Sequence, residues 1–316
     1  MTTSTKTKTI KLRWALAHEP ITTFEAAAKR FAGIVGEKTA GAVQVEVLSA
    51  ADIVGGRKLT PAEVVELVAS GRVEMCQTYT TALGKLHEPL WVLDLPYLFK
   101  DHAHAERVLD GAVGQGLLEG LRKVGLVGLA FTYSGGFRIT VSRSKEIRRA
   151  DDFRGLRVRT AETPVAEAIM RRLGAEPLAA PLRDVRALAD SGRVDAAEIT
   201  YPRYAWQGLP AALPVSNETW HSLLLTSMTV HAGFWDRLEP AHRQAVAAAA
   251  VEAALIERAT SIEEGKQAMA NEASLGYRRV AVPEAELARL RELTAPVYGE
   301  FEPRFGADLI GAIRGA

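Results

Sequence analysis

The sequence predicts an α/β protein built from two similar units, and three observations carry that prediction. Its 316 residues are enough for roughly two domains. Segments with strand and helix patterns alternate through about residue 200, which is typical of a largely parallel sheet. The stretches 64–75 and 185–196 also share one pattern: a helix, then Ser-Gly-Arg-Val, an acid and a strand. That repeat is too widely spaced for a solenoid and fits two comparable lobes.

The composition excludes several classes of protein. With 47% hydrophobic and 24% charged residues, the chain is typical of a globular protein with a sizeable core. It has 39 Lys and Arg against 38 Asp and Glu, and this balance argues against a nucleic-acid partner and against a disordered tail protein. The single cysteine, Cys76, cannot form a disulfide framework or a multi-thiolate zinc site, and its apolar surroundings predict a buried, inert thiol.

The first unit is predicted element by element from periodicity and capping signals. A β-type run opens the chain, and Thr22 followed by Glu25 suggests a capping box before an amphipathic helix that Gly41 stops. Thr60-Pro61 gives the next helix an N-cap and a proline in its first turn, and Gly71 ends it. We therefore expect strands at 10–17, 43–48 and 73–78, and helices at 23–38 and 61–70.

The second unit is expected to begin after the stretch 133–136. Its predicted strands are 137–142, 156–160 and 194–199, and Thr163-Pro164 opens a helix that ends at Gly174. Helical patterning then runs from 240 to about 275 with only Gly265 inside it. Such a helix would be on the order of 50 Å long and could brace both units, unless it breaks at Gly265. A short strand at 280–282 and helical pattern at 284–313, stopped near Pro303, complete the prediction.

Motifs of common enzymes are missing from the sequence. It contains no Gly-x-Ser-x-Gly, no P-loop lysine motif, no His-Glu-x-x-His and no Gly-x-Gly-x-x-Gly after a strand. His102 and His104 are spaced i, i+2, so they do not share a helix face, and we interpret them as solvent-facing. We expect neither a metal nor a cofactor.

Function-like chemistry gathers in two strand segments that carry arginines. Arg138 lies in Gly-Phe-Arg-Ile-Thr, and Arg157 and Arg159 share one face of Leu-Arg-Val-Arg-Thr. An arginine in a half-buried strand needs an internal partner or an anionic ligand, and its guanidinium can clamp a carboxylate through two parallel hydrogen bonds. The pattern alone favours the internal salt bridge, with Asp195 and Glu198 as candidate partners.

A series of segments, in this order, resembles one family of binding proteins. The shared stretches begin with Phe31…Gly-Glu-Lys-Thr-x-Gly41, Ser-Gly-Arg-Val-Glu-Met and Leu-Pro-Tyr-Leu-Phe with Asp-His-x-His-Ala. They continue through Gly-Phe-Arg-Ile-Thr, Asp-Phe-Arg-Gly-Leu-Arg-Val-Arg, Leu-Gly-Ala, Gly-Arg-Val-Asp-Ala-Ala-Glu and Trp-His. Over about residues 10–300 the chain thus resembles the solute-binding proteins of TRAP (tripartite ATP-independent periplasmic) transporters, the DctP family.

The resemblance implies a two-lobed periplasmic-binding-protein (Venus-flytrap) fold with a long helix spanning both lobes. On that pattern lobe I comprises 10–135 and 225–264, and lobe II comprises 136–224 and 265–316. The hinge strands would lie near 133–137 and 222–228, and residues 1–9 would form a polar tail. The two lobes would close on an organic anion held in the cleft between them.

The resemblance also implies the roles of four residues. Arg159 matches the family arginine that clamps the ligand carboxylate, and Arg138 matches a second family arginine. Glu198 and His221 match polar residues that hold the clamp.

The sequence departs from the family pattern directly after Glu198, where many members have an asparagine and this chain has Ile199. Thr200 or Tyr201 could substitute for it, or the ligand could bind in another pose. Further expected contacts are His18 and Glu19 after the first strand, Tyr79 at the end of the third, and Thr163 beyond the clamp strand. For the last two, a core aromatic and a helix N-cap are the alternative interpretations.

The expected function is therefore an extracytoplasmic solute-binding protein that delivers a small organic acid to the membrane subunits of a TRAP transporter. We expect a monomer, located in the periplasm, whose signal peptide has been removed or replaced, because residues 1–17 lack the apolar core of a secretory signal. Two alternatives stay open: a soluble α/β enzyme with Arg159 as substrate anchor and His221 as general base, and a sensor-associated binding protein.

Overall fold

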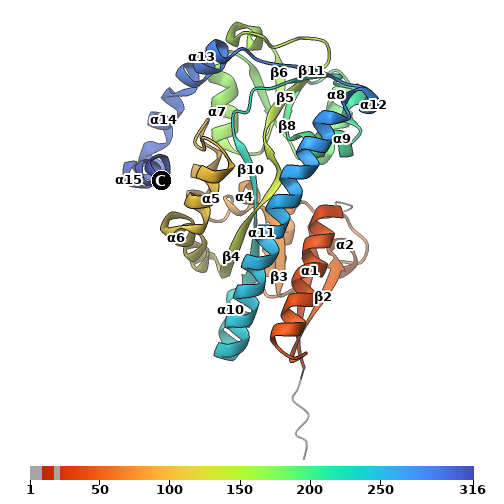
Figure 1. Cartoon of the computed structure of the whole chain (residues 1–316), viewed down its shortest axis with the longest axis vertical. Coiled ribbons are helices and arrows are strands. Elements are labelled where there is room, and N and C mark those ends of the chain that lie inside the picture. Colours follow the sequence, from red (N-terminus) through yellow and green to blue (C-terminus); the bar gives the residue numbers. More distant parts are fainter. Residues whose placement is uncertain (1–8, 18–21) are drawn as a thin grey trace, which may run out of the picture. The chain divides into compact units, whose positions relative to one another are not determined.

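The computed structural model describes residues 9–17 and 22–316 (Figure 1). Their contacts divide the chain into two units. Unit 1 comprises the residues up to His87 together with Gly116–Thr132 and Thr226–Thr260, and unit 2 comprises Glu88–Gln115, Tyr133–Leu225 and Ser261–Ala316. The lobe boundaries that the resemblance implied stay a prediction. The contacts group 88–115 with unit 2, whereas the prediction placed this segment in lobe I.

The sheet of unit 1 has the order β2-β1-β3-β10-β4. Strand β1 (Ile10–Leu16) pairs in parallel with both β2 (Val43–Ser49) and β3 (Met75–Tyr79). The predicted parallel arrangement is confirmed for these three strands. β10 (Leu223–His231), which lies beyond the alternating segments on which that prediction rested, runs antiparallel to β3. The fifth strand is β4 (Leu126–Phe137).

Helices pack a continuous apolar core onto this sheet. Trp14 of β1 meets Phe31 of the predicted first helix edge to face, with ring centroids 5.1 Å apart. Thr60 caps the next helix as predicted, and Glu63 completes a capping box with it. Cys76 is fully buried, and burial raises the pKa of its thiol to about 12, which confirms the prediction of an inert cysteine. The helices here are α1 (Thr22–Lys38), α2 (Ala50–Ile53), α3 (Pro61–Ala69), α4 (Thr80–Leu83) and α10 (Ala232–Arg237).

The sheet of unit 2 has the order β11-β9-β5-β8-β6-β7. Strand β6 (Arg157–Thr160) is parallel to β7 (Glu176–Ala179) and β8 (Ala196–Ile199), whereas β5 (Ile139–Ser142) is antiparallel to β8 and to β9 (Val215–Asn217). β11 (Arg278–Val280) closes one edge. The predicted strand at 137–142 is divided, so Arg138 lies between β4 and β5.

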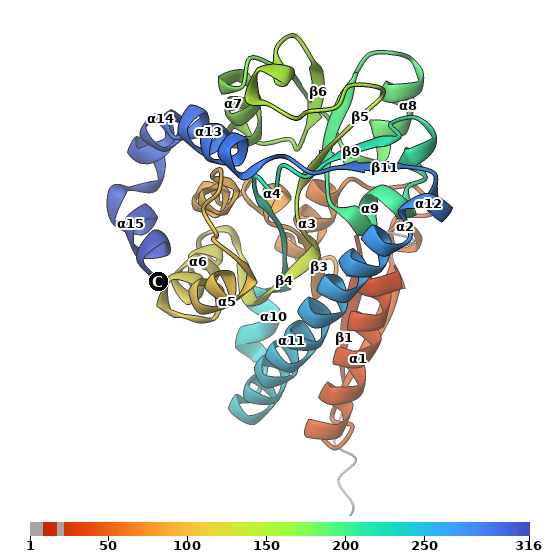
Figure 2. The same cartoon turned by 45° about the horizontal axis from the view of Figure 1, so that its top comes forward.

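The predicted stop near Pro303 is confirmed in the C-terminal helices. Helical structure includes Pro303 and ends two residues later at Phe305, because Gly306 adopts a φ of 86°. Figure 2 shows the last three helices following one another towards the C-terminus. The α-helices are α5 (His102–Asp110), α7 (Pro164–Arg172), α8 (Val185–Asp190), α9 (Tyr201–Trp206), α12 (Glu272–Leu275), α13 (Glu284–Thr294), α14 (Pro296–Phe305) and α15 (Ala307–Gly315).

Four elements contribute residues to both units: the strands β4 and β10 and two helices. Helix α11 (Pro240–Ala270) is continuous through Gly265, so the unbroken alternative is confirmed, and its 31 residues extend for about 46 Å. Its residues up to Thr260 group with unit 1 and those from Ser261 with unit 2. α6 (Ala112–Gly120) is divided in the same way. Within the described residues no helix is long and apolar enough to cross a membrane. Short 3-10 helices occupy Glu88–Asp94, Leu121–Val124, Ala150–Phe153, Leu182–Asp184 and Leu209–Ala211.

The repeated Ser-Gly-Arg-Val motif has the same backbone in both units. Gly71 and Gly192 have φ values of 74° and 69°, and each follows the end of a helix. The amide of the next residue reaches back to the helix in both copies, from Arg72 to the Leu67 carbonyl at 3.0 Å and from Arg193 to the Leu188 carbonyl at 2.9 Å. These are the bonds of a glycine-terminated helix end.

The repeat extends to the neighbouring strand. In unit 1 the acid of the motif, Glu74, accepts hydrogen bonds from the backbone N and from the Nε and Nη2 of Arg13 on β1, at 2.8–2.9 Å. In unit 2, Asp195 accepts the same three bonds from Arg157 on β6, at 3.1, 2.8 and 2.6 Å. β1 and β6 are therefore equivalent strands, as are β3 and β8.

Candidate functional site

Arg159 is a buried arginine near the end of β6, with 6% of its surface exposed. Its Nε and Nη2 donate to the carbonyl oxygen of Ala180 at 2.8 and 2.5 Å, and its Nη1 lies 3.4 Å from the carbonyl oxygen of Glu198. These bonds to main-chain carbonyls fix the orientation of the guanidinium. Of the two arginines predicted to share this strand face, Arg159 is therefore the buried one.

Arg157, on the same strand face, is exposed and lies in an ion pair. Its guanidinium pairs with Asp195 and its side chain is 45% exposed. The alternative of an ordinary salt bridge is thus correct for Arg157.

Glu198, in the middle of the sheet on β8, is a buried carboxylate that uses both oxygens. Oε1 accepts from the backbone N of Ala161 at 2.6 Å, and Oε2 accepts from Nε2 of His221 at 3.0 Å. Burial raises the pKa of Glu198, but the charge of Arg138 and the hydrogen bonds from His221 and Ala161 together have a larger, opposite effect and lower it to about 2. Glu198 is therefore an anion at neutral pH.

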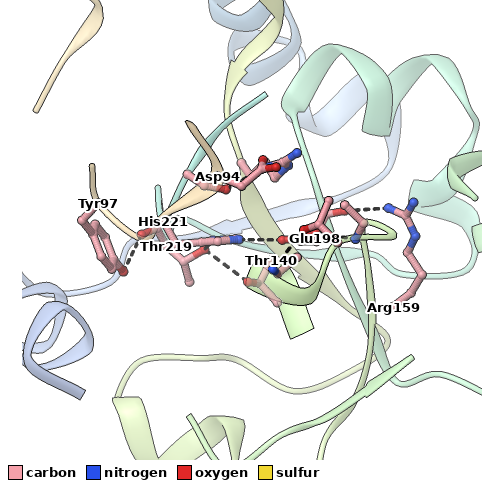
Figure 3. A network of polar contacts seen from close by, with 12 residues as sticks. Asp94, Tyr97, Thr140, Arg159, Glu198, Thr219 and His221 are labelled. Carbon is pink, nitrogen blue, oxygen red and sulfur yellow. Dashed lines mark hydrogen bonds and ion pairs between the residues drawn. The ribbon is translucent and has the colours of Figure 1, made fainter. Parts of the chain in front are cut away.

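His221 connects this carboxylate to two threonines. Because the ionised Glu198 can only accept, Nε2 of His221 must carry a hydrogen. The other ring nitrogen, Nδ1, lies 2.9 Å from Thr219 Oγ1, which in turn lies 3.2 Å from Thr140 Oγ1 (Figure 3). Both ring nitrogens thus have partners within the fold, and the ring is held in one orientation.

Arg138 is the second buried arginine, and its position between β4 and β5 places it beside a second acid. Its Nη1 donates to Asp94 Oδ1 at 3.0 Å and to Ser222 Oγ at 2.8 Å. Burial raises the pKa of Asp94; the charge and the hydrogen bond of Arg138 lower it, and Glu198 raises it again, so the net pKa lies above its ordinary value. Arg138 therefore acts on both carboxylates.

Sequence reasoning missed Asp94, although a signal was present. The residue stands in Val-Leu-Asp-Leu-Pro, an acid inside an apolar run, which is the feature that singled out Glu198. Sequence reasoning also missed Thr140 and Thr219, since threonines in strands and loops carry no such signal.

The structure brings four of the predicted residues into one neighbourhood. Arg138, Arg159, Glu198 and His221 are all buried in unit 2. Hydrogen bonds join Arg159 and His221 to Glu198 (Figure 3), and Arg138 acts on Glu198 through its charge. Such a network holds a buried cation in place, and a buried cation can bind an anion.

The remaining predicted contacts also have roles in the fold. Thr163 caps α7 by accepting from the backbone N of Ala166 at 3.1 Å. Thr200 donates to the carbonyl of Ser134 at 2.8 Å. Tyr79 is 8% exposed at the end of β3 and contacts Phe24 edge to face. His18 and Glu19 lie outside the described residues.

Ile199, which replaces the family asparagine, belongs to the apolar core of unit 2. The hydroxyl of the neighbouring Tyr201 bonds to Ser216 Oγ at 2.8 Å and donates to Glu218 Oε1 at 3.0 Å. Both candidates for the asparagine's role, Thr200 and Tyr201, therefore have hydrogen-bond partners within the fold.

The prediction that His102 and His104 face the solvent is wrong for His104. This ring is fully buried, with Nδ1 accepting from the backbone N of Lys100 at 3.1 Å and Nε2 2.8 Å from the carbonyl of Ile313. His102 is half-buried between the rings of Tyr133 and Phe137. Within the ranges that the structure describes, no three His, Cys, Asp or Glu side chains gather as metal ligands would.

Comparison with known proteins identifies the family. The model of the DctP family, described as bacterial extracellular solute-binding protein, family 7, matches residues 15–304. The C4-dicarboxylate-binding periplasmic protein DctP of Rhodobacter capsulatus is 29% identical over 293 residues, which cover 92% of this chain and 85% of the relative.

Solved structures agree with this result. A TRAP periplasmic solute-binding protein of Polaromonas sp. JS666, bound to D-erythronate, superposes with a TM-score of 0.87 at 26% identity and covers 97% of this chain and 99% of its own. A homologue from Bradyrhizobium sp. BTAi1 in complex with D-galacturonate gives a TM-score of 0.87 at 25% identity, covering 97% and 100%. The family and these relatives are all described as solute-binding proteins. The chain belongs to the DctP family of periplasmic solute-binding proteins of TRAP transporters.

Proposed function

We propose that this protein captures a small organic acid by clamping its carboxylate with Arg159, and that it delivers the acid to the membrane subunits of a TRAP transporter. A guanidinium forms two parallel hydrogen bonds with a carboxylate, and such charge-assisted bonds are roughly twice as strong as neutral ones. A solute carboxylate would accept such bonds from the Arg159 guanidinium, in addition to the bonds that Arg159 makes within the fold.

The observation that carries this proposal is the difference between two equivalent strands. Arg13 and Arg157 make the same three bonds in their units, and two residues further along are Ala15 on β1 and Arg159 on β6. The strand registers agree, since Ala15 faces Cys76 and Arg159 faces Ala197. The same scaffold is thus stable with an alanine at this position, so a buried arginine there is not a requirement of the fold.

The surroundings of Arg159 support the same conclusion. Glu198 is an acid on the adjacent strand, and its main-chain carbonyl accepts from Arg159. The two oxygens of its carboxylate accept from the backbone N of Ala161 and from His221. Its charge is therefore directed towards the histidine and the backbone. Arg138 adds a second buried positive charge near Glu198.

The proteins bound to sugar acids suggest the class of ligand. D-erythronate and D-galacturonate, the ligands of the two homologues, each carry one carboxylate and several hydroxyls. We propose Arg138, Glu198 and His221 as the residues that support the clamp. Further proposed contacts are Tyr79, Thr163, Thr200, His18 and Glu19, whose hydroxyl, imidazole or carboxylate groups could bond to the hydroxyls of such a ligand.

The test is ligand-induced thermal stabilisation of Arg159→Met, with D-erythronate, D-galacturonate and succinate as probes. We expect at least one probe to raise the Tm of the wild type, because a ligand that binds only the folded state stabilises it. The variant should lose this shift at every probe concentration that saturates the wild type. Calorimetry then gives the affinity and stoichiometry.

Arg157→Met is the matched control. It removes an arginine from the same face of the same strand, two residues away, where the side chain is exposed and paired with Asp195. Its shift should equal that of the wild type. A full shift in Arg159→Met would show that the clamp is assigned to the wrong residue.

A further inference from the structure

Tyr97 makes two hydrogen bonds to the main chain of the segment Thr219–His221, which carries the site histidine. The backbone N of Tyr97 donates to the carbonyl of His221 at 2.8 Å, and its hydroxyl donates to the carbonyl of Thr219 at 3.1 Å. Figure 3 shows the ring of Tyr97 next to this segment. Both bonds end on the main chain, on the two residues that flank Trp220.

Both sides of this contact have an unusual backbone. Tyr97 has a φ of 52° and Trp220 a φ of 48°, and only one other described non-glycine residue, Ala40, has a positive φ. Bulky aromatic residues are genuine outliers in this region, and the surrounding structure must hold them there. The two strained residues, Tyr97 and Trp220, lie in the two segments that these hydrogen bonds join. Strain of this kind concentrates at sites where geometry matters for function.

A continuous chain of hydrogen bonds leads from this contact to the end of β6, the strand that carries Arg159. His221 Nδ1 meets Thr219 Oγ1 at 2.9 Å, and His221 Nε2 donates to Glu198, which accepts from the backbone N of Ala161. Ala161 follows Arg159 by two residues. A displacement of the 219–221 main chain would therefore move His221 away from Glu198 and loosen the end of β6.

We infer that Tyr97 is a positioning residue for the solute site, acting through the main chain of Thr219–His221. Its phenol suits this role, because burial raises the pKa of Tyr97 and the hydroxyl stays a donor at every physiological pH. The guanidinium of Arg291 on α13 lies 5.3 Å from the ring centroid and covers the ring. This inference rests on the proposed function for its effect on binding, but not for its effect on His221.

The test compares Tyr97→Phe with Tyr298→Phe. Each variant removes one tyrosine hydroxyl that donates to a carbonyl in a partly buried place, to Thr219 at 3.1 Å for Tyr97 and to Pro96 at 2.8 Å for Tyr298. Their losses of Tm should be similar. Tyr298→Phe keeps both hydrogen bonds from Tyr97 to 219–221, because the hydroxyl of Tyr298 bonds to the carbonyl of Pro96 and Tyr97 itself makes the bonds to that segment.

Two readouts separate positioning from general stability. In protein labelled with 15N at histidine, Tyr97→Phe should shift the His221 ring nitrogens, whereas Tyr298→Phe should leave them at their wild-type positions; His221→Gln assigns the signal. With D-erythronate or D-galacturonate, whichever stabilises the wild type, Tyr97→Phe should weaken binding by roughly 5- to 10-fold, the loss of one hydrogen bond.

The results distinguish this inference from the proposed function. If Tyr97→Phe matches Tyr298→Phe in both the His221 signals and the affinity, Tyr97 does not position the site. If Arg159→Met binds normally, the clamp is wrong, and the His221 signals still decide the role of Tyr97.

Discussion

The two units use the same strand pair, β1 and β3 or β6 and β8, to hold different polar groups. Three residues after the acid of the repeated motif, unit 1 has Gln77 and unit 2 has Glu198. The amide nitrogen of Gln77 lies 2.8 Å from Thr132 Oγ1, 3.1 Å from Thr226 Oγ1 and 2.6 Å from Glu257 Oε1. Each residue thus connects several segments of its unit, one as a neutral donor and one as an anionic acceptor.

The comparison separates what the fold requires from what is added to it. The pairs Arg13–Glu74, which is half-buried, and Arg157–Asp195, which is more exposed, recur in the two units and belong to the scaffold. The groups further along the strands differ: where unit 1 has an alanine and an amide, unit 2 has Arg159 and Glu198. A buried charge is costly unless it is paired or used, so the charged version is the one to connect with solute binding.

The largest loss of stability is expected when Gln77 of unit 1 is replaced by the glutamate that unit 2 has at the equivalent position, Glu198. Gln77→Glu would place a second carboxylate beside the buried Glu257, where the amide now donates at 2.6 Å. Two carboxylates in one buried place cannot both ionise without a large cost. We expect the free energy of unfolding, measured in urea at pH 8, to fall by roughly 3–5 kcal/mol.

The loss should shrink at lower pH, because one proton shared by the pair restores a hydrogen bond. The exchange variant, Gln77→Glu with Glu257→Gln, keeps one amide and one carboxylate and should recover most of the stability. An unchanged stability of Gln77→Glu at pH 8 would break the comparison, since unit 1 would then tolerate an anion in this place.

A smaller effect is expected when unit 2 is made neutral. Glu198→Gln should make stability less sensitive to acid, because the pKa of Glu198 is about 2 in the folded protein and 4.5 ordinarily. A lowered pKa contributes stability that is complete above pH 4.5 and is lost as the pH falls towards 2. The wild type should exceed the variant at pH 6, and the difference should narrow by an amount on the order of 2–3 kcal/mol between pH 5 and pH 2.

Measuring the difference between the two proteins, by urea unfolding at each pH, removes contributions that they share. Asp94 acts in the opposite direction, since its raised pKa stabilises the fold as the pH falls, and its contribution cancels only in part because the charge of Glu198 helps to raise that pKa. A difference that stays constant from pH 6 to pH 2 would mean that Glu198 is not the ionised hub of unit 2.

The scaffold could be predicted from the sequence because its signals are local. The Thr60 cap, the left-handed Gly71 and Gly192 and the unbroken helix through Gly265 all follow from neighbouring residues. The antiparallel course of β5 and β10 could not be predicted, because strand direction depends on partners far away in sequence. Pro303 marked the end of a helix to within two residues, since the helix includes it and ends at Phe305.

The candidate site was predictable to the extent that its residues break a pattern. Arg138, Arg159 and Glu198 stand out as charges in apolar strands, and the resemblance added His221. Tyr97 gave no such signal, since its importance lies in a positive φ and in two bonds to the main chain of a distant segment. His104 was misread for the same reason: its partner, Ile313, lies 209 residues away.

The smallest effect should come from the pairs that the units share. Arg13→Met and Arg157→Met each remove a guanidinium that is 37% or 45% exposed, and each leaves the backbone N–H bonded to the acid. Exposed ion pairs contribute little because water screens them, so we expect each variant to lower the Tm by about 1–3 °C. The two losses should agree within about 1 °C and diminish together in high salt. A large loss for only one of them, measured by thermal unfolding of the solute-free protein, would mean that the two strand pairs are not equivalent. Ala15 would then no longer be the counterpart of Arg159, and the argument that the fold does not require this arginine would lose its basis.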